Sequence, residues 1–199
     1  KTGVVLHNAL LCIFSAIVMI KTWPMLIPYV KGDYASEIDF WNAGCGAWSI
    51  IFYVSKFYEF IDSWVLVLKG EDPSFLQVYH HAGVVFTMYT AVETRSNWIL
   101  YMVTLNSFIH TIMYAYYVAS TLGYKHPWAK YLTKAQITQF YIGIGASCGF
   151  YWSESPTIHQ IIGLQMMHAY AIGLIFLFMD MAKKKYSDGV KKPNDNKEE

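Results

Sequence analysis

The chain has 199 residues, of which 55% are hydrophobic, 18% are aromatic and only 15% are charged, and its net charge is +1. A soluble domain carries about 25% charged residues, so this composition indicates a membrane protein and excludes an ordinary soluble domain. The near-neutral charge and the lack of a basic stripe with interleaved aromatic residues give no indication of nucleic-acid binding, and no nucleic-acid partner is expected.

The hydrophobic residues form six long runs, each near the roughly 20 residues that a helix needs to cross a bilayer. The runs are continuous and do not alternate in polarity, which favours helices over the strands of a barrel. We therefore predict an all-α, polytopic membrane helical bundle. Its six predicted transmembrane helices cover residues 3–20, 40–68, 75–92, 97–119, 134–152 and 157–181.

Prolines and short polar turns separate these runs, and we expect Pro24 and Pro28 to end the first span or begin a loop. Because the chain starts at Lys1 rather than Met, in the middle of the pattern, we expect it to be a fragment. Residues 1–182 are predicted to form the transmembrane domain. Residues 183–199 are polar and rich in Lys and Asp, so we expect a disordered tail.

Positive charge predicts how the spans are oriented, because cytoplasmic loops carry an excess of Lys and Arg. With the tail in the cytoplasm, eleven Lys residues lie on that side, and three Lys or Arg residues lie on the other. The sequence therefore predicts a cytoplasmic C-terminus.

Polar residues recur within the apolar runs at helical spacing, so each set lies on one face of its helix. At about 1.5 Å per residue, these sets fall in the cytoplasmic half of the membrane, as do His7 and Asn8. Polar stripes can join helices, but ionisable groups are costly in a bilayer, and we infer a polar chamber that opens toward the cytoplasm. The stripes are Lys56, Glu59, Asp62 and Ser63; Gln77, His80 and His81; Asn106, His110, Tyr114 and Tyr117; and Thr133, Gln136 and Gln139.

Three kinds of chemistry fit the histidines of such a chamber. Imidazole ligates iron, and the Q-x-x-H-H pattern is similar to one box of the membrane di-iron desaturases, although no second box exists and no metal site is predicted. A neutral imidazole can also act as a nucleophile or general base in acyl transfer or carbon–carbon condensation. The third possibility is a transporter with a polar cavity and no catalysis.

Four motifs in this order resemble one family, the very-long-chain fatty acid elongases, which are membrane 3-ketoacyl-CoA synthases of the ELO type. They are K-x-x-E-x-x-D-S from Lys56, Q-x-x-H-H from Gln77, N-x-x-x-H-x-x-M-Y-x-Y-Y from Asn106 and T-x-x-Q-x-x-Q from Thr133. The resemblance extends from about residue 4 to residue 181. It implies a bundle of seven helices, six of which surround a substrate tunnel, so the first family helix would be missing from this chain.

The resemblance also implies a reaction and a location. A long-chain acyl-CoA would condense with malonyl-CoA to give 3-ketoacyl-CoA, CoA and CO₂, with no cofactor beyond these substrates. The protein would lie in the endoplasmic reticulum membrane. Its candidate partners are the bilayer, the two CoA esters, other enzymes of the elongation cycle and a second copy of the chain.

Site residues follow from the same resemblance. His80 would attack the acyl thioester, His81 and His110 would handle protons or polarise carbonyls, Asp62 or Glu59 would orient an imidazole, and Lys56 would balance charge or stabilise an enolate. The residues expected to contact substrate are Gln77, Asn106, Tyr114, Tyr117, Gln136 and Gln139, with the CoA phosphates at Lys125, Lys130 or Lys134. Many family members have His where this chain has Gln77, and the Gln form is associated with polyunsaturated chains.

Overall fold

The computed structural model describes residues 1–31, 37–124, 127–152 and 156–187, and all regular secondary structure within these residues is helical. In chain order the elements are α1 (Thr2–Lys31), α2 (Glu37–Phe40), the π-helix η1 (Trp41–Cys45), α3 (Gly46–Tyr58), α4 (Phe60–Leu68), α5 (Phe75–Glu93), α6 (Ile99–Leu122), α7 (Ala129–Ser147), the 3₁₀ helix η2 (Cys148–Trp152) and α8 (Ile158–Ser187).

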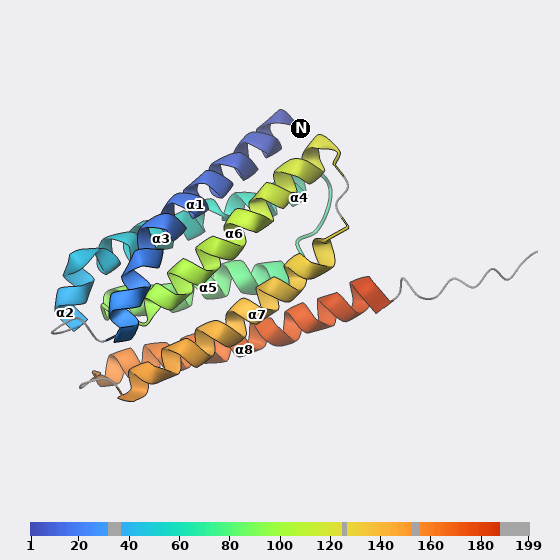
Figure 1. Ribbon diagram of the computed structural model, residues 1–199. Helices are drawn as coiled ribbons and strands as arrows, with labels where there is room; N and C mark the ends of the chain where they lie inside the picture. The colour runs from blue at the N-terminus through green and yellow to red at the C-terminus, as the bar shows by residue number, and fades with distance from the viewer. Residues whose placement is uncertain (32–36, 125–126, 153–155, 188–199) are drawn as a thin grey trace, which may run out of the picture.

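The long helices lie side by side in a closed ring (Figure 1). Going round it, α1 contacts α6, α6 contacts α7, α7 contacts α8, α8 contacts α5, α5 contacts α3, and α3 returns to α1. The six predicted spans correspond to α1, α3 with α4, α5, α6, α7 and α8. A ring of this kind encloses an interior into which the polar stripes can point.

The outer faces of the ring are apolar. On α1, Leu6, Ile13, Ile17 and Ile20 are all exposed and recur at intervals that place them on one side of the helix. An exposed apolar surface of this extent indicates that the helix contacts lipid or another apolar partner rather than water. By length and composition, Thr2–Tyr29 and Ile158–Tyr186 are each able to cross a membrane.

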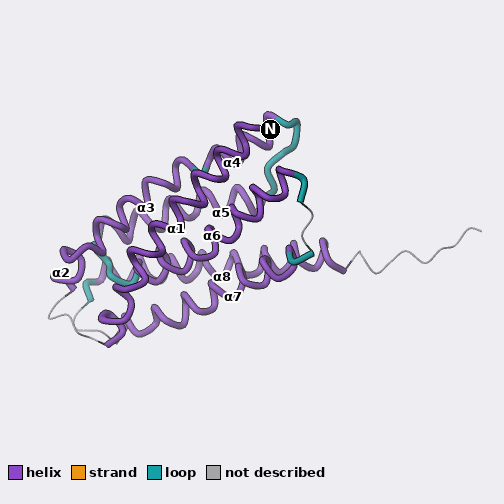
Figure 2. Tube along the Cα trace, turned by 45° about the horizontal axis from the view of Figure 1, so that its top comes forward, coloured by secondary structure: helices purple, strands orange, loops and turns teal. Residues whose placement is uncertain are grey.

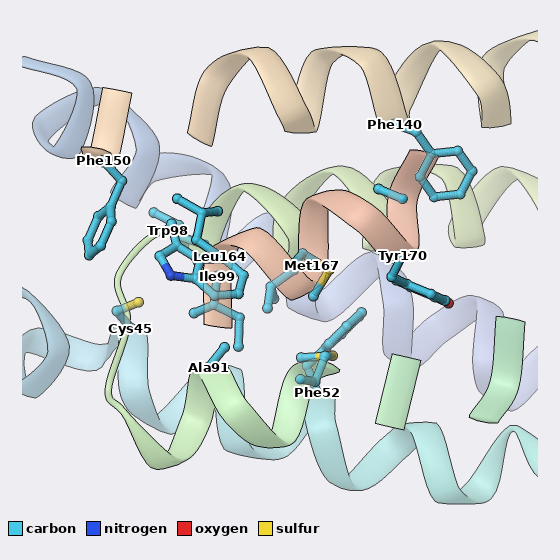
Figure 3. Close-up of a cluster of buried hydrophobic side chains, with 14 of the residues drawn as sticks. Cys45, Phe52, Ala91, Trp98, Ile99, Phe140, Phe150, Leu164, Met167 and Tyr170 are labelled. Atoms are coloured by element: carbon cyan, nitrogen blue, oxygen red, sulfur yellow. The ribbon is translucent and has the colours of Figure 1, made fainter. Parts of the chain in front are cut away.

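The interior of the ring has an apolar end and a polar end. Buried hydrophobic side chains fill the end that holds η1, the start of α6 and the start of α8, and Figure 3 shows Trp98, Ile99, Leu164 and Met167 among them. The opposite end holds the chain N-terminus, α4, the start of α5 and the end of α6, as the ribbon of Figure 1 and the Cα tube of Figure 2 both show. The predicted polar stripes lie at this second end.

The prediction that Pro24 and Pro28 end the first helix is wrong, because α1 continues through both of them to Lys31. Each proline removes one backbone donor, but in lipid a broken helix would leave many more groups unpaired, so prolines are tolerated in such helices. Tertiary contacts hold the last turns: the Tyr29 ring stacks on Phe40 at 4.7 Å and meets Tyr101 edge-on at 5.7 Å.

The second predicted span is interrupted at Glu59, which lies between α3 and α4. The Asp62 N–H donates to the Glu59 carbonyl at 3.0 Å, a tighter turn than that of an α-helix. The sequence predicts that the disordered tail begins at residue 183, but α8 continues to Ser187. Residues 188–199 lie outside the described part of the chain.

Candidate active site

A cavity of about 560 Å³ lies inside the polar end of the ring. This volume is in the range of about 300–1,000 Å³ that is usual for small-molecule sites. Exposed residues at helix ends, Lys69, Ser74 and Lys185, belong to its wall, so the cavity opens at the end of the bundle. Other lining residues include Val4, His7, Asn8, Glu59, Asp62, Leu76, Gln77, His80, His81, Ile109, His110, Met113, Tyr114, Tyr117, Thr133, Gln136, Gln139, Phe140 and Phe178.

Three imidazoles gather on one wall of this cavity. His80 and His81 come from the second turn of α5, and His110 comes from the middle of α6. The His80 ring lies 5.4 Å from the His81 ring, centroid to centroid, and 6.3 Å from the His110 ring. His81 and His110 are buried, whereas His80 is partly accessible. Adjacent residues of one helix therefore meet a residue of a second helix around a space that a ligand can enter.

A buried ion pair between Lys56 and Glu59 lies next to the imidazoles. Lys56 and Glu59 are almost fully buried, and the Lys56 Nζ donates to the Glu59 Oε1 at 2.7 Å and to the Asn106 Oδ1 at 3.0 Å. The same Nζ lies 4.0 Å from the centre of the Phe52 ring. These contacts compensate the charge of Lys56, as a buried ammonium requires. Lys56 and Asn106 stand outside the cavity wall, and Glu59 is the member of the pair that lines the cavity.

Glu59 is also the carboxylate that faces the histidines. Its Oε1 lies 3.4 Å from the His110 Nδ1, a close charge contact without hydrogen-bond geometry. Within the described residues, the Glu59 Oε2 and the His81 Nδ1 have no hydrogen-bond partner. Buried polar atoms are normally paired, so these two unpaired atoms are exceptions to the usual pattern.

Asp62 occupies a different part of the site. Its Oδ1 is 2.8 Å from the His7 Nε2, and its Oδ2 accepts a hydrogen bond from the Tyr114 hydroxyl at 2.7 Å. The His7 Nδ1 lies 3.4 Å from the Tyr58 hydroxyl. Both carboxylate oxygens are thus engaged, and Asp62 connects α1, α4 and α6. The imidazole beside Asp62 is that of His7, which the predicted catalytic set did not include although its depth in the membrane was a signal.

Of the amide and phenol residues predicted to contact substrate, all except Asn106 line the cavity. The Gln77 Nε2 donates to the Ser63 Oγ at 3.0 Å, so this amide joins α5 to α4. Gln136 contacts the sulfur of Met113 at 3.4 Å, and the buried Gln139 has an Oε1 without a hydrogen-bond partner among the described residues. Tyr117 packs edge-on against Tyr114, with the ring centroids 6.0 Å apart.

Two of the three lysines expected at the CoA phosphates do not line the cavity. Lys130 and Lys134 are exposed on α7, where their ammonium groups lie 5.1 and 5.9 Å from the Tyr131 ring, and neither lines the cavity. Lys125 lies outside the described residues. Lys69, after α4, and Lys185, near the end of α8, line the cavity instead. Their sequence positions next to span ends were the available signal, but the rotation of α7 could not be read from the sequence.

Among the described residues, no group of three or more His, Cys, Asp or Glu side chains is arranged to hold a metal ion. The site instead combines three imidazoles, a buried Lys–Glu pair and a second carboxylate with an apolar wall. Together with the lipid-facing ring of helices, it defines a class of protein: a polytopic membrane protein with an internal, histidine-lined cavity.

The comparisons with known proteins then assign the family. A model of the GNS1/SUR4 family matches residues 1–194, and the chain therefore belongs to this family. As a member it is an all-α polytopic membrane protein, and both the predicted fold class and the predicted family resemblance are confirmed.

Curated relatives are similar over most of the chain. Fatty acid elongase 1 of Trypanosoma cruzi is 30% identical over 92% of this chain and 68% of its own length. Fatty acid elongase A of Dictyostelium discoideum is 28% identical over 94% of this chain and 74% of its own. Very long chain fatty acid elongase 4 of Homo sapiens is 33% identical over 83% of this chain and 53% of its own. The chain thus spans between about half and three quarters of the length of these relatives.

Proposed function

We propose that the protein condenses a long-chain acyl-CoA with malonyl-CoA to give 3-ketoacyl-CoA, CoA and CO₂, the first step of fatty acid elongation. The observation that carries the proposal is the group of three imidazoles beside a 560 Å³ cavity with an apolar wall, in a chain whose relatives are named fatty acid elongases. The polar groups suit a thioester, and the apolar side chains around the cavity suit the acyl tail.

In the first half-reaction an imidazole nitrogen of His80 attacks the acyl carbonyl carbon. The carbon–sulfur bond breaks, the CoA thiolate leaves, and the His80 ring becomes an N-acylimidazole. The proton that the ring loses passes to the thiolate, so free CoA is released. His80 suits this role because it is the partly accessible member of the three histidines, and an imidazole is an established type of covalent nucleophile.

We propose that His110 moves that proton. The Glu59 carboxylate beside the His110 Nδ1 favours a proton on this nitrogen and leaves Nε2 as the base. A carboxylate orients the histidine of a catalytic triad in the same way, and Lys56 compensates the carboxylate charge. Asp62 contacts His7 and Tyr114, so we assign the orienting role to Glu59 and not to Asp62.

In the second half-reaction malonyl-CoA enters and loses CO₂, and the electron pair of the broken carbon–carbon bond remains on C2 as an enolate. This carbon attacks the acyl carbon on His80, the carbon–nitrogen bond breaks, and the ring regains a proton that comes from water at the open end of the cavity. His81 lines the cavity, and a proton on its Nδ1, which has no hydrogen-bond partner among the described residues, is the donor that we assign to the enolate oxygen. Donors that are already in place at a developing charge lower the barrier in a dry site.

The open end of the cavity suits the CoA moiety, which is a polyanion and stays in water. Among the described residues, Lys69 and Lys185 line the cavity at this opening, and we propose that they contact the CoA phosphates. The opening lies on the side where the charge distribution puts the cytoplasm, so the C-terminus is cytoplasmic in this proposal, with the protein in the endoplasmic reticulum membrane. The Gln77 form of the histidine motif favours polyunsaturated acyl chains as substrates.

The test supplies membranes that contain the protein with labelled malonyl-CoA and a panel of acyl-CoA esters. We expect labelled 3-ketoacyl-CoA two carbons longer than the substrate, and no product from a His80→Ala variant. Labelled acyl-CoA without malonyl-CoA should transfer its acyl group to the wild-type protein and not to His80→Ala. Oxygen-dependent and iron-dependent desaturation would favour the desaturase alternative, and acyl-CoA movement without any product would favour a transporter.

A further inference from the structure

Helices α5 and α8 pack through two tyrosines and two glycines. The rings of Tyr79 on α5 and Tyr170 on α8 stack with their centroids 5.5 Å apart and their planes at 27°. The Tyr170 ring lies against Gly83, and the Tyr79 hydroxyl lies against Gly173, so that a Cβ atom on either glycine would overlap the facing tyrosine. Small residues let membrane helices approach closely, and here each glycine accepts the aromatic ring of the other helix.

Tyr170 makes one contact that Tyr79 does not. Its hydroxyl donates a hydrogen bond of 2.8 Å to the backbone carbonyl of His80, a residue 90 positions away in the chain. Tyr170 is buried and does not line the cavity, so its hydroxyl contacts His80 from the α8 side and not from the substrate space. Figure 3 shows Tyr170 extending from α8 at the end of the buried cluster that also holds Phe140.

The His80 backbone needs such a contact because it lies near the start of α5. The segment before α5, from Glu71 to Ser74, is exposed or partly exposed and is not helical. The His80 ring lies 6.3 Å from the ring of His110, which belongs to α6. The first two turns of α5 are therefore held from the α8 side, and a shift of this backbone would move the His80 ring relative to His110.

We propose that Tyr170 is a positioning residue for His80: with its ring against Gly83 and its hydroxyl on the His80 carbonyl, it sets the direction of the His80 imidazole. The inference rests on the proposed function, in which His80 accepts the acyl group. A misplacement of a reacting group by about 1 Å can lower a rate by roughly 100-fold, so one backbone hydrogen bond is sufficient to affect the reaction. Substrate binding in the cavity should not change, since Tyr170 does not line it.

The experiment measures acyl transfer from labelled acyl-CoA to the protein, and then steady-state elongation, in three variants. Tyr170→Phe keeps the ring and removes the hydroxyl. Gly83→Ala displaces the ring by adding a Cβ beneath it. Tyr79→Phe is the matched control, because it removes a hydroxyl from the same pair of rings but not the bond to His80.

We expect Tyr170→Phe to lower both the acylation rate and kcat by about tenfold while the KM for acyl-CoA stays within about twofold. Gly83→Ala should lower the same two rates, and Tyr79→Phe should leave them within about twofold of wild type. The thermal unfolding midpoint in detergent is measured for each variant, and rates are compared per folded protein.

Wild-type acylation in Tyr170→Phe would overturn the inference, as would equal losses of rate and of unfolding midpoint in Tyr170→Phe and Tyr79→Phe, since these indicate a packing role alone. A wild-type protein that takes no acyl label and makes no product would instead overturn the proposed function, and the role of Tyr170 would be lost with it.

Discussion

The buried pair of Lys56 and Glu59 leads to a quantitative prediction about stability. The exposed fractions of the two side chains are 0% and 2%, and their charged atoms are 2.7 Å apart. Removing one partner of such a pair leaves an uncompensated charge in a low-dielectric interior and typically costs about 3–5 kcal/mol. We therefore expect Lys56→Met and Glu59→Gln each to lower the free energy of unfolding by about this amount.

The double variant distinguishes this cause from a general loss of packing. In Lys56→Met/Glu59→Gln neither charge remains, so the cost should be smaller than the sum of the two single costs by at least about 2 kcal/mol. Asn106, whose Oδ1 accepts from Lys56, loses a donor in both the single Lys56 variant and the double variant and so cancels from the comparison.

The measurement is reversible unfolding in mixed detergent micelles, followed by tryptophan fluorescence, for the wild type and the three variants. A double-mutant cycle then gives the coupling free energy of the pair. Additive costs, or single costs below about 1 kcal/mol, would refute the reasoning, because they would mean that water or another group compensates each charge. Acyl transfer should be lost in Glu59→Gln even when the folded protein is isolated, since His110 loses its orienting carboxylate.

The remaining predictions concern the second carboxylate and the cavity opening. Asp62→Asn and His7→Phe should each lower the free energy of unfolding by about 1.5–3 kcal/mol, the usual value for a hydrogen bond to a charged group. The double variant should lower it by little more than the larger of the two single changes, and additive losses would contradict a direct interaction between Asp62 and His7. Lys69→Gln and Lys185→Gln should each raise the KM for acyl-CoA about threefold at low salt, with a smaller effect at 0.5 M salt because ions screen exposed charges. Lys130→Gln is the control for both, and an equal rise in its KM would contradict the assignment of the phosphate contacts to the cavity opening.

Much of the fold and of the composition of the site could be predicted from local patterns. The apolar runs predicted the long helices, and the recurrence of polar residues every three or four positions predicted which faces turn inward. The depth of each stripe in its span predicted that His80, His110 and Gln136 would gather at one end of the bundle, and all three line one cavity. These are properties of a single helix, whose repeat and rise are the same in any context.

Other features depend on several helices at once and could not be predicted in this way. The motif holds Glu59 and Asp62 three residues apart, yet Glu59 faces His110 whereas Asp62 faces His7. The helix is interrupted at Glu59, between α3 and α4, so helical spacing by itself does not fix the directions of these two side chains. The continuation of α1 through Pro24 likewise depends on contacts with other elements.

The amino-acid sequence therefore specifies which side of each helix is polar, because the repeat of 3.6 residues per turn is the same whatever packs against the helix. It does not specify which atoms meet across two helices, because those distances depend on how far each helix is rotated and how closely it approaches the next. Side-chain packing between helices sets both quantities, as where Gly83 admits the Tyr170 ring and brings its hydroxyl to the carbonyl of His80.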